Sequence, residues 1–556
     1  MRCMKIATTT LLAALAGFFL TIVTFADGEC GPNLKWTISD DGTLTISGNG
    51  EMTDFSYSNV PWKEERDQIS RIVIEDGVTT VGEHAFYYCR NLLSAQLPDS
   101  LVSIGKYAFE NCDSLVSVNI PNGISSIREQ VFYGCDNLSG IVLPENLASI
   151  DRLAFYDCRN LGEIVIPASV TIISDYRVFD GCSRLANIIV EDNNPNYISE
   201  DGVLFNKDRS VILCYPCGKT YTSYQIPEGV TAINQYAFYQ NENIQKITVP
   251  GSVIQIGENA FGICEKLSEI VLNEGIQSIG ATAFHHCRSL PAITFPSSLV
   301  YLGDDVFESC SKLMSIQIAG DSGTYKSVDD VLFSADGTVL IAYPNGKGAT
   351  SYTVPDSVTT IGDYAFIHNR NIVTISFPEG LISIGKSAFN GCDKITSLDF
   401  PSTLTSIESN AFSSCDGLTS LVIPESVTVL GYEAFSWCDN LTNVTIKNAA
   451  TSFDKYGVFD YCGDALALTG IAGSTTENHA NEEGFLFIEA NFGEAEPTVL
   501  NDTWICSECG SEMDGGNFCS ECGAARPKGQ ICQNCGYEVE EGKTFNYCPE
   551  CGTKFE

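Results

Sequence analysis

The sequence AFENCDSLVSVNIPNGISSIREQ occupies residues 108–130, and close copies of it fill the middle of this 556-residue chain. The Phe of its Ala-Phe or Val-Phe pair recurs mostly at intervals of 23 residues, with two intervals of 24. Self-similarity at this period predicts a solenoid, in which each coil buries its apolar side chains against its neighbours. The recurring Phe residues are Phe86, Phe109, Phe132, Phe155, Phe179, Phe238, Phe261, Phe284, Phe307, Phe366, Phe389, Phe412, Phe435 and Phe459.

The pattern within one unit predicts two short extended segments. Alternation in "LVSVNIP" places Leu115, Val118 and Ile120 on the inner face of a strand, which Pro121 ends because it lacks a ladder donor. A second extended segment carries the apolar residues of "ISSI". The Ala-Phe pair follows, and its Phe fills the coil centre. These positions therefore form a packed core and not a pocket.

A glycine follows the second segment in several units and predicts a turn with positive φ, a conformation that glycine adopts without steric cost. These glycines are Gly105, Gly257, Gly280 and Gly385.

Two longer intervals interrupt the repeat, one from Phe179 to Phe238 and one from Phe307 to Phe366. They contain DGVLFNKDRSVILCYPCGK from Asp201 and DDVLFSADGTVLIAYPNGK from Asp329, so a larger block, made of one long interval and the regular units beside it, is itself repeated. Each interval predicts a hairpin insert, near residues 191–222 and 319–350, with two strands joined by a polar turn.

Three residues after the Phe, twelve of the fourteen units have Cys and two have Asn, at Asn241 and Asn369. Because Asn is a poor substitute for a thiolate, this exchange favours a small buried side chain that bonds to backbone, and we predict a ladder of free structural thiols. Disulfides and metal binding are the alternatives. The ladder cysteines are Cys89, Cys112, Cys135, Cys158, Cys182, Cys264, Cys287, Cys310, Cys392, Cys415, Cys438 and Cys462.

A further cysteine pair, Cys214 and Cys217, has redox-motif spacing in "CYPC". It lies on an insert strand, however, and the other insert has Ala342 and Asn345 at these positions. A redox role and inert thiols remain the two alternatives.

The repeated unit resembles the leucine-rich repeat of BspA-like bacterial surface proteins, with its "IP…V..IG..AF..C..L" pattern, over about residues 70–470. The resemblance implies a mainly β leucine-rich-repeat solenoid over residues 71–462, preceded by a β-rich cap at 27–70 and closed by an α+β cap at 463–490. In the second cap, Ser474 and Glu477 predict a capping box for a helix over 475–483, ended by Gly484. "FLFIEA" would add a last strand.

The same resemblance implies a non-enzymatic scaffold, because BspA-like proteins are associated with adhesion to host proteins and other cells. The expected partners are proteins, including those of a host or neighbouring cell surface. The two positions after each Phe often hold Tyr, His or Trp and would line one edge with aromatic side chains, either as partner anchors or as surface residues without a role. The five histidines are scattered in the sequence and form no recognisable catalytic motif: His84, His285, His286, His368 and His479.

The formal charge of −39 disfavours nucleic acid and anionic membranes as partners, because such a surface repels phosphate. Residues 1–26 combine Arg2 and Lys5 with a long uncharged run, which predicts a cleaved signal peptide or an uncleaved anchor. Either interpretation places the rest outside the cytoplasm, secreted or at the cell surface, with membrane contact only through this segment if it is uncleaved.

The chain ends, after a polar linker at residues 491–503, in four C-x-x-C-G motifs. Each pair of motifs predicts a four-thiolate site, so two structural zinc ions would fold two zinc ribbons, at 504–524 and 530–554, resembling the double zinc ribbon family. Iron, as in rubredoxin, is the alternative metal. Docking of these ribbons to an envelope complex, as a zinc-dependent assembly or regulatory module, is the alternative function. The predicted ligands are Cys506, Cys509, Cys519, Cys522, Cys532, Cys535, Cys548 and Cys551.

Overall fold

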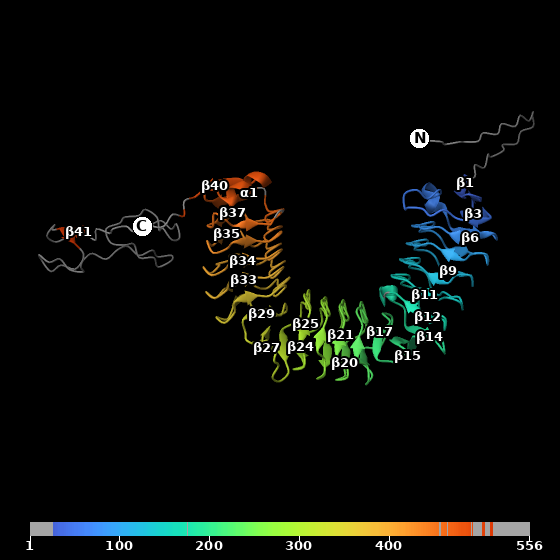
Figure 1. The fold of residues 1–556 in the computed structure, drawn as a ribbon, viewed down its shortest axis with the longest axis horizontal. Coiled ribbons are helices and arrows are strands. Elements are labelled where there is room, and N and C mark those ends of the chain that lie inside the picture. Colours follow the sequence, from blue (N-terminus) through green and yellow to red (C-terminus); the bar gives the residue numbers. More distant parts are fainter. Residues whose placement is uncertain are drawn as a thin grey trace, which may run out of the picture. The chain divides into compact units, whose positions relative to one another are not determined.

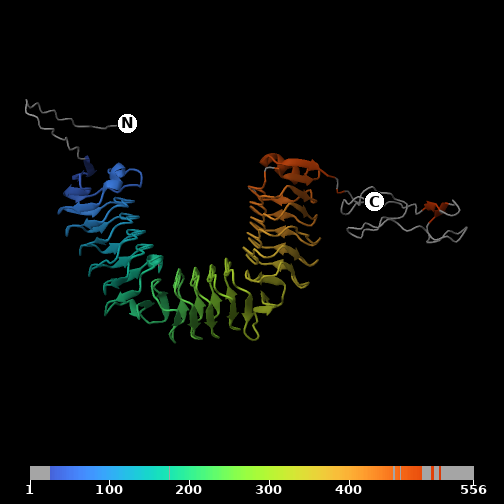
Figure 2. The same cartoon turned by 180° about the vertical axis from the view of Figure 1, so that it is seen from behind.

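The computed structural model describes residues 26–174, 176–454, 457–463, 465–490, 492, 503–505 and 512–514. The chain divides after Ala490 into two units, which are described separately. In the first unit short strands stack in chain order from β1 to β40, as Figure 1 shows from one side and Figure 2 from behind. The predicted mainly β solenoid of stacked repeats is confirmed.

The regular coils each contribute to two stacks of short parallel strands. In one stack β7 (Ser94–Gln96) pairs with β9 (Ser117–Val118), and in the other β10 (Ser126–Ile127) pairs with β11 (Ser149–Ile150). The partners Ser126 and Ser149 occupy the same position in successive units, so the strand register equals one repeat. The inward positions are buried as predicted, although Ile120 is only partly covered.

The amino-terminal part contains an antiparallel meander of β1, β2 and β3, and β3 then pairs in parallel with the first repeat strand, β5. Trp62 is fully buried, donates through Nε1 to the carbonyl of Ala85 (2.8 Å) and stacks on Phe86 at 5.8 Å. Besides β7, β9, β10 and β11, the elements up to the first insert are β1 (Ala26–Gly31), β2 (Leu34–Ile38), β3 (Thr43–Gly48), β4 (Gly50–Glu51), the 3₁₀ helix η1 (Lys63–Gln68), β5 (Arg71–Ile74), β6 (Val78–Val81), β8 (Ser103–Ile104), β12 (Glu163–Ile166), β13 (Ile172–Ile173), η2 (Tyr176–Phe179) and β14 (Asn187–Val190).

Each insert is an antiparallel meander of three strands that rejoins the parallel stack. In the first, β15 (Tyr197–Glu200), β16 (Val203–Asn206) and β17 (Val211–Cys214) follow one another, and β17 pairs in parallel with β19 (Ala232–Ile233). The predicted hairpins are present, and β15 is an additional strand. The strands that follow are β18 (Ser223–Gln225), β20 (Lys246–Val249), β21 (Gln255–Ile256), β22 (Glu269–Leu272), β23 (Ser278–Ile279), β24 (Ala292–Phe295), β25 (Tyr301–Leu302) and β26 (Ser315–Ile318).

The second insert repeats this arrangement with β27 (Tyr325–Val328), β28 (Val331–Ser334) and β29 (Val339–Ala342). The last regular coils contain β30 (Ser351–Thr353), β31 (Thr360–Ile361), β32 (Thr374–Ser376), β33 (Ser383–Ile384), β34 (Ser406–Ile407), β35 (Ser420–Ile423), β36 (Val429–Leu430), β37 (Asn443–Ile446) and β38 (Ser452–Phe453).

The core is a ladder of stacked Phe rings flanked by aliphatic side chains. Neighbouring rings are 5.6 Å apart at Phe109 and Phe132 and 5.0 Å apart at Phe389 and Phe412. At the inserts a tyrosine takes the place of the Phe, because Tyr215 stacks on Phe238 at 4.8 Å and Tyr343 stacks on Phe366 at 4.9 Å. The buried apolar residues accordingly form three clusters, which meet at the two inserts.

The predicted positive φ of the repeated glycines is wrong. Gly105 has no positive φ, and a Cβ at this position would lie 2.5 Å from the backbone nitrogen of Glu83 in the preceding coil. Glycine is therefore required because two backbones approach closely. The left-handed residues instead flank the Phe of every coil except that of Phe179 and are mostly not glycines, as at Tyr107 (φ 61°) and Asn111 (φ 55°) on either side of Phe109.

The carboxyl-terminal end of the first unit contains α1 (Thr475–Glu483), as the sequence predicts. The Ser474 hydroxyl accepts a hydrogen bond from the Glu477 amide (3.3 Å), and Gly484 is left-handed (φ 83°). β40 (Leu486–Glu489) pairs in parallel with β39 (Ala467–Gly470) as the last strand of its sheet. None of the described helices is long and apolar enough to cross a membrane.

In the second unit the described residues form a hairpin of β41 (Thr503–Ile505) and β42 (Glu512–Asp514). The eight predicted metal ligands lie outside the described residues, and so do the signal or anchor segment before residue 26 and the linker apart from residues 492 and 503.

Candidate functional site

The surface most suited to binding lies beside the Phe ladder. We call it the Phe edge and define it by the residues two before, one after and two after the Phe of each coil. Backbone hydrogen bonds join this edge from coil to coil, since the Tyr88 amide donates to Glu110 O (2.8 Å) and the Asn111 amide donates to Tyr133 O (2.7 Å). In every coil except that of Phe179, a left-handed residue on each side of the Phe turns the backbone sharply, so these side chains are presented at an edge that is fixed by the core.

Aromatic side chains on the Phe edge stack between neighbouring coils. Tyr133 and Tyr156 are 4.8 Å apart and nearly parallel, and Trp437 and Tyr461 are 4.1 Å apart. The last two remain 49% and 63% exposed. Stacking reduces the rotamer freedom of these rings while leaving large apolar faces in water, which is the arrangement of a preorganised binding surface.

A half-buried cation occupies the Phe edge beside the first insert. The Arg177 guanidinium donates from Nε to Asp180 Oδ2 (3.0 Å), and its Cζ lies 4.5 Å from the ring centre of Tyr236. The rings of Tyr156 and Tyr239 lie at 5.7 and 5.9 Å. The coil that carries Arg177 has one extra residue and forms η2 here.

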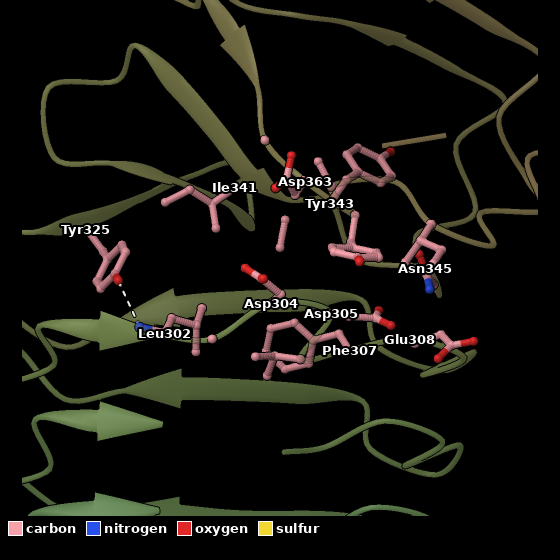
Figure 3. Close-up of a pocket in the computed structure, with 17 residues that line it drawn as sticks. Leu302, Asp304, Asp305, Phe307, Glu308, Tyr325, Ile341, Tyr343, Asn345 and Asp363 are labelled. Carbon is pink, nitrogen blue, oxygen red and sulfur yellow. Dashed lines mark hydrogen bonds between the residues drawn. The ribbon is translucent and has the colours of Figure 1, made fainter. Parts of the chain in front are cut away.

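A pocket of about 270 Å³ lies on the Phe edge beside the second insert (Figure 3). Asp305 and Glu308 line one side, and Tyr343 and Tyr364 come from the insert and the coil after it. Burial and the neighbouring Glu308 carboxylate raise the pKa of Asp305 to about 8. The sequence patterns above did not identify this pocket, but aligning the two larger repeated blocks would have shown that Asp305 replaces Arg177.

The ladder thiols are structural. In the described part of the chain every ladder cysteine is free, and all but Cys462 are buried. The Cys112 thiol donates to Phe86 O of the preceding coil (3.2 Å), and burial raises the pKa of Cys89 and Cys264 to about 12. Asn241, at the same position of its unit, also donates to a backbone carbonyl of the preceding coil, Pro216 O (3.2 Å). The prediction that Cys and Asn both bond to backbone here is confirmed.

The insert pair does not have the properties of a redox site. Cys214 and Cys217 are both buried, and burial raises the pKa of each thiol. Cys217 donates to Tyr239 O (3.4 Å). A reactive cysteine needs an accessible thiolate, so this environment favours the interpretation as inert thiols.

The histidines are separate, and nothing in the described residues shows catalysis. His285 and His286 are half-buried, whereas the sequence suggested two solvent-facing positions. The His285 ring bonds to Thr282 O (3.0 Å) and His479 stacks on Phe453 at 4.3 Å. The described residues contain no group of His, Cys, Asp or Glu that could hold a metal ion.

Comparison with known families gives a match to the BspA type leucine rich repeat region (6 copies) over residues 64–198, 214–336 and 342–465. Among solved structures, a leucine-rich repeat protein from Eubacterium ventriosum is 26% identical, with a TM-score of 0.51 over 70% of this chain and 95% of that one. A leucine rich cell surface protein from Faecalibacterium prausnitzii is 23% identical, with a TM-score of 0.41 over 81% and 96% of the two chains. No curated protein matches.

Proposed function

Because the chain belongs to the BspA-type leucine-rich repeat family, we propose that it is a non-enzymatic scaffold, secreted or held at the cell surface, that binds proteins through its Phe edge. The observation that carries this proposal is the Phe edge itself, where stacked and half-exposed aromatic rings are held by backbone hydrogen bonds between neighbouring regular coils. The similar protein from Faecalibacterium prausnitzii is named a cell surface protein. The charged N-terminus followed by an uncharged run supports export of this chain.

The proposal is tested by binding of the purified full chain to arrays of extracellular-matrix proteins, cell-surface proteins and glycans. Replacing Trp437 and Tyr461 by Ala should weaken binding to a protein target at least tenfold, because these rings are the most exposed stack on the edge. Tyr301→Ala is the matched control, since Tyr301 is 57% exposed but lies on β25, away from the Phe edge. Absence of any protein target, or equal loss in the control, would overturn the proposal.

We also propose that the eight C-terminal cysteines hold two structural zinc ions. The pairing of β41 with β42 supports this, because the strands bracket the first C-x-x-C motif, and such a hairpin suits a zinc knuckle. Metal analysis of the full chain under reducing conditions should give two zinc ions per chain and one after Cys506→Ser. Fewer than one zinc per chain, or iron in its place, would contradict the assignment.

Docking of the ribbons to an envelope complex is the alternative role of this tail. Deletion of residues 504–556 would then abolish localisation in fractionation and protease-shaving experiments, while the solenoid remains folded. Normal localisation of the truncated protein would exclude docking.

A further inference from the structure

The two inserts permit a comparison within one molecule, because they belong to two copies of the same larger block of sequence. Beside the first insert the guanidinium of Arg177 is held between the Asp180 carboxylate and the ring of Tyr236. All three residues lie on the Phe edge. This geometry joins a charge-assisted hydrogen bond to a cation–π contact, which together suit a guanidinium particularly well.

Beside the second insert the two groups that hold the guanidinium keep their chemistry, but the guanidinium is replaced. Glu308 stands at the position of Asp180, Tyr364 at that of Tyr236, and Asp305 at that of Arg177. The formal charge of the arginine–carboxylate pair is therefore zero in the first block. In the second block the pair of carboxyl groups carries −1 while Asp305 holds its proton, and −2 once both groups are ionised. The second block thus keeps the two groups that hold the cation in the first block. At the position of the cation itself it has a carboxyl group.

The second position is also hollow. The pocket of about 270 Å³ is lined by Asp305, Glu308 and Tyr364, and Figure 3 shows the two carboxylates on the side opposite Tyr343 and Asn345. The Oδ1 atom of Asp305 is buried and has no hydrogen-bond partner among the described residues. Leaving a buried carboxylate oxygen unpaired is costly, so a donor that enters the pocket would be bound favourably.

Two cations of the chain contact Glu308 and Tyr364 at the pocket, but neither contacts Asp305. His368 Nδ1 lies 3.3 Å from Glu308 Oε1, and Lys386 Nζ lies 5.6 Å from the ring centre of Tyr364. In the described residues no Lys, Arg or His forms an ion pair with Asp305. The acidic residues Asp304 and Asp363 also line the pocket and add to its negative field.

We propose that this pocket binds a guanidinium group, supplied by an arginine side chain of a partner polypeptide. The group would donate to Asp305 and Glu308 and lie against Tyr364, as Arg177 does against Asp180 and Tyr236. A planar fork of donors matches two carboxylates better than an ammonium ion does. The polypeptide source rests on the proposed protein-binding function, whereas the guanidinium site rests on the pocket and its counterpart.

The direct test is calorimetric titration of the full chain with N-acetyl-arginine amide, using N-acetyl-citrulline amide as an uncharged probe of the same shape. The arginine probe should bind at least tenfold more tightly. Asp305→Arg should abolish its binding, because the new side chain reproduces the first block and fills the pocket, and Glu308→Gln should weaken it at least tenfold with little change in shape. Asp321→Arg is the matched control, since Asp321 is exposed, lies outside the pocket and undergoes the same charge change.

Equal affinity for the two probes, or equal loss in Asp321→Arg, would overturn the site. Agmatine carries the guanidinium without a peptide backbone. If it binds tenfold more tightly than the blocked arginine probe, the proposal that a polypeptide supplies the guanidinium is overturned. A protein target that binds normally to Asp305→Arg would remove this inference and leave the proposed function intact. If the chain binds the arginine probe but no protein target, the guanidinium site stands and the proposed protein-binding function falls.

Discussion

Exchange of the two ladder asparagines for cysteine should have unequal effects, although both residues occupy the same position of the repeat. Asn241 donates to Pro216 O (3.2 Å) and accepts from the amide of Ile244 (2.9 Å). Asn369 accepts in the same way from Ile372 (3.1 Å), but its Nδ2 is buried and has no partner in the described structure. Cysteine therefore removes satisfied donors in one coil and an unsatisfied donor in the other.

The magnitude follows from this difference. Both substitutions lose the acceptor of the turn amides, so that cost is shared and cancels in the comparison. Relief of a buried unsatisfied donor is worth ~1–3 kcal/mol, and a net hydrogen bond is worth ~1 kcal/mol. Asn241→Cys should therefore destabilise its coil by about 2 to 4 kcal/mol more than Asn369→Cys does.

Amide hydrogen exchange of the two coils, in reducing buffer, is the appropriate assay, because a repeat array opens locally and a single unfolding free energy is not defined for it. Asn122→Cys, at an exposed position, controls for the presence of an extra thiol. Equal destabilisation of the two coils, or a larger effect at Asn369, would refute the argument from hydrogen bonds.

Three further outcomes are expected. Gly105→Ala should destabilise its coil by ~1–3 kcal/mol in amide hydrogen exchange because its Cβ would meet backbone at 2.5 Å, whereas Gly140→Ala, with nothing within 4 Å, should not. Cys462 should react with a thiol reagent before Cys112 in peptide mapping of the native chain, because it is the one ladder thiol that is not fully buried, and its hydrogen bond with Cys438 lowers its pKa. The pKa of Asp305 is raised from 3.8 to about 8, so the folded state keeps this proton to higher pH than the unfolded state does. The stability of the folded state should therefore fall as the pH rises from about 4 to 8, by a few kcal/mol at ~1.4 kcal/mol per pH unit. Thermal scans at several pH values should show this loss in the parent chain and not in Asp305→Asn.

The regular part of the fold was predictable because each coil repeats one local solution. The spacing of the repeat appears directly as the register between Ser126 and Ser149, and the alternation around Val118 predicts its burial. The hairpins of the inserts were visible for the same reason, as apolar runs separated by a polar turn. A single chain with fourteen copies of one unit contains its own alignment.

The errors concern contacts between coils, which no single unit encodes. Gly105 is indistinguishable in sequence from a turn glycine, but its role is set by the backbone of Glu83 in the preceding coil. Likewise, the left-handed residues include Tyr107 and Trp437, residue types that do not indicate positive φ. His285, which is half-buried, likewise stacks on Tyr239, two coils earlier, at 6.1 Å.

The inserts explain why the unusual sites occur where they do. In regular coils the Phe rings stack closely, and the amide of Tyr88 bonds to the next coil. At each insert a tyrosine on a different backbone takes the place of the next Phe in the stack. Next to this break in the repeat the first block places Arg177, whereas the second places Asp305 beside a pocket. The two copies of the block thus differ in charge at a position that adjoins the break in the repeat, although the core around them is built alike.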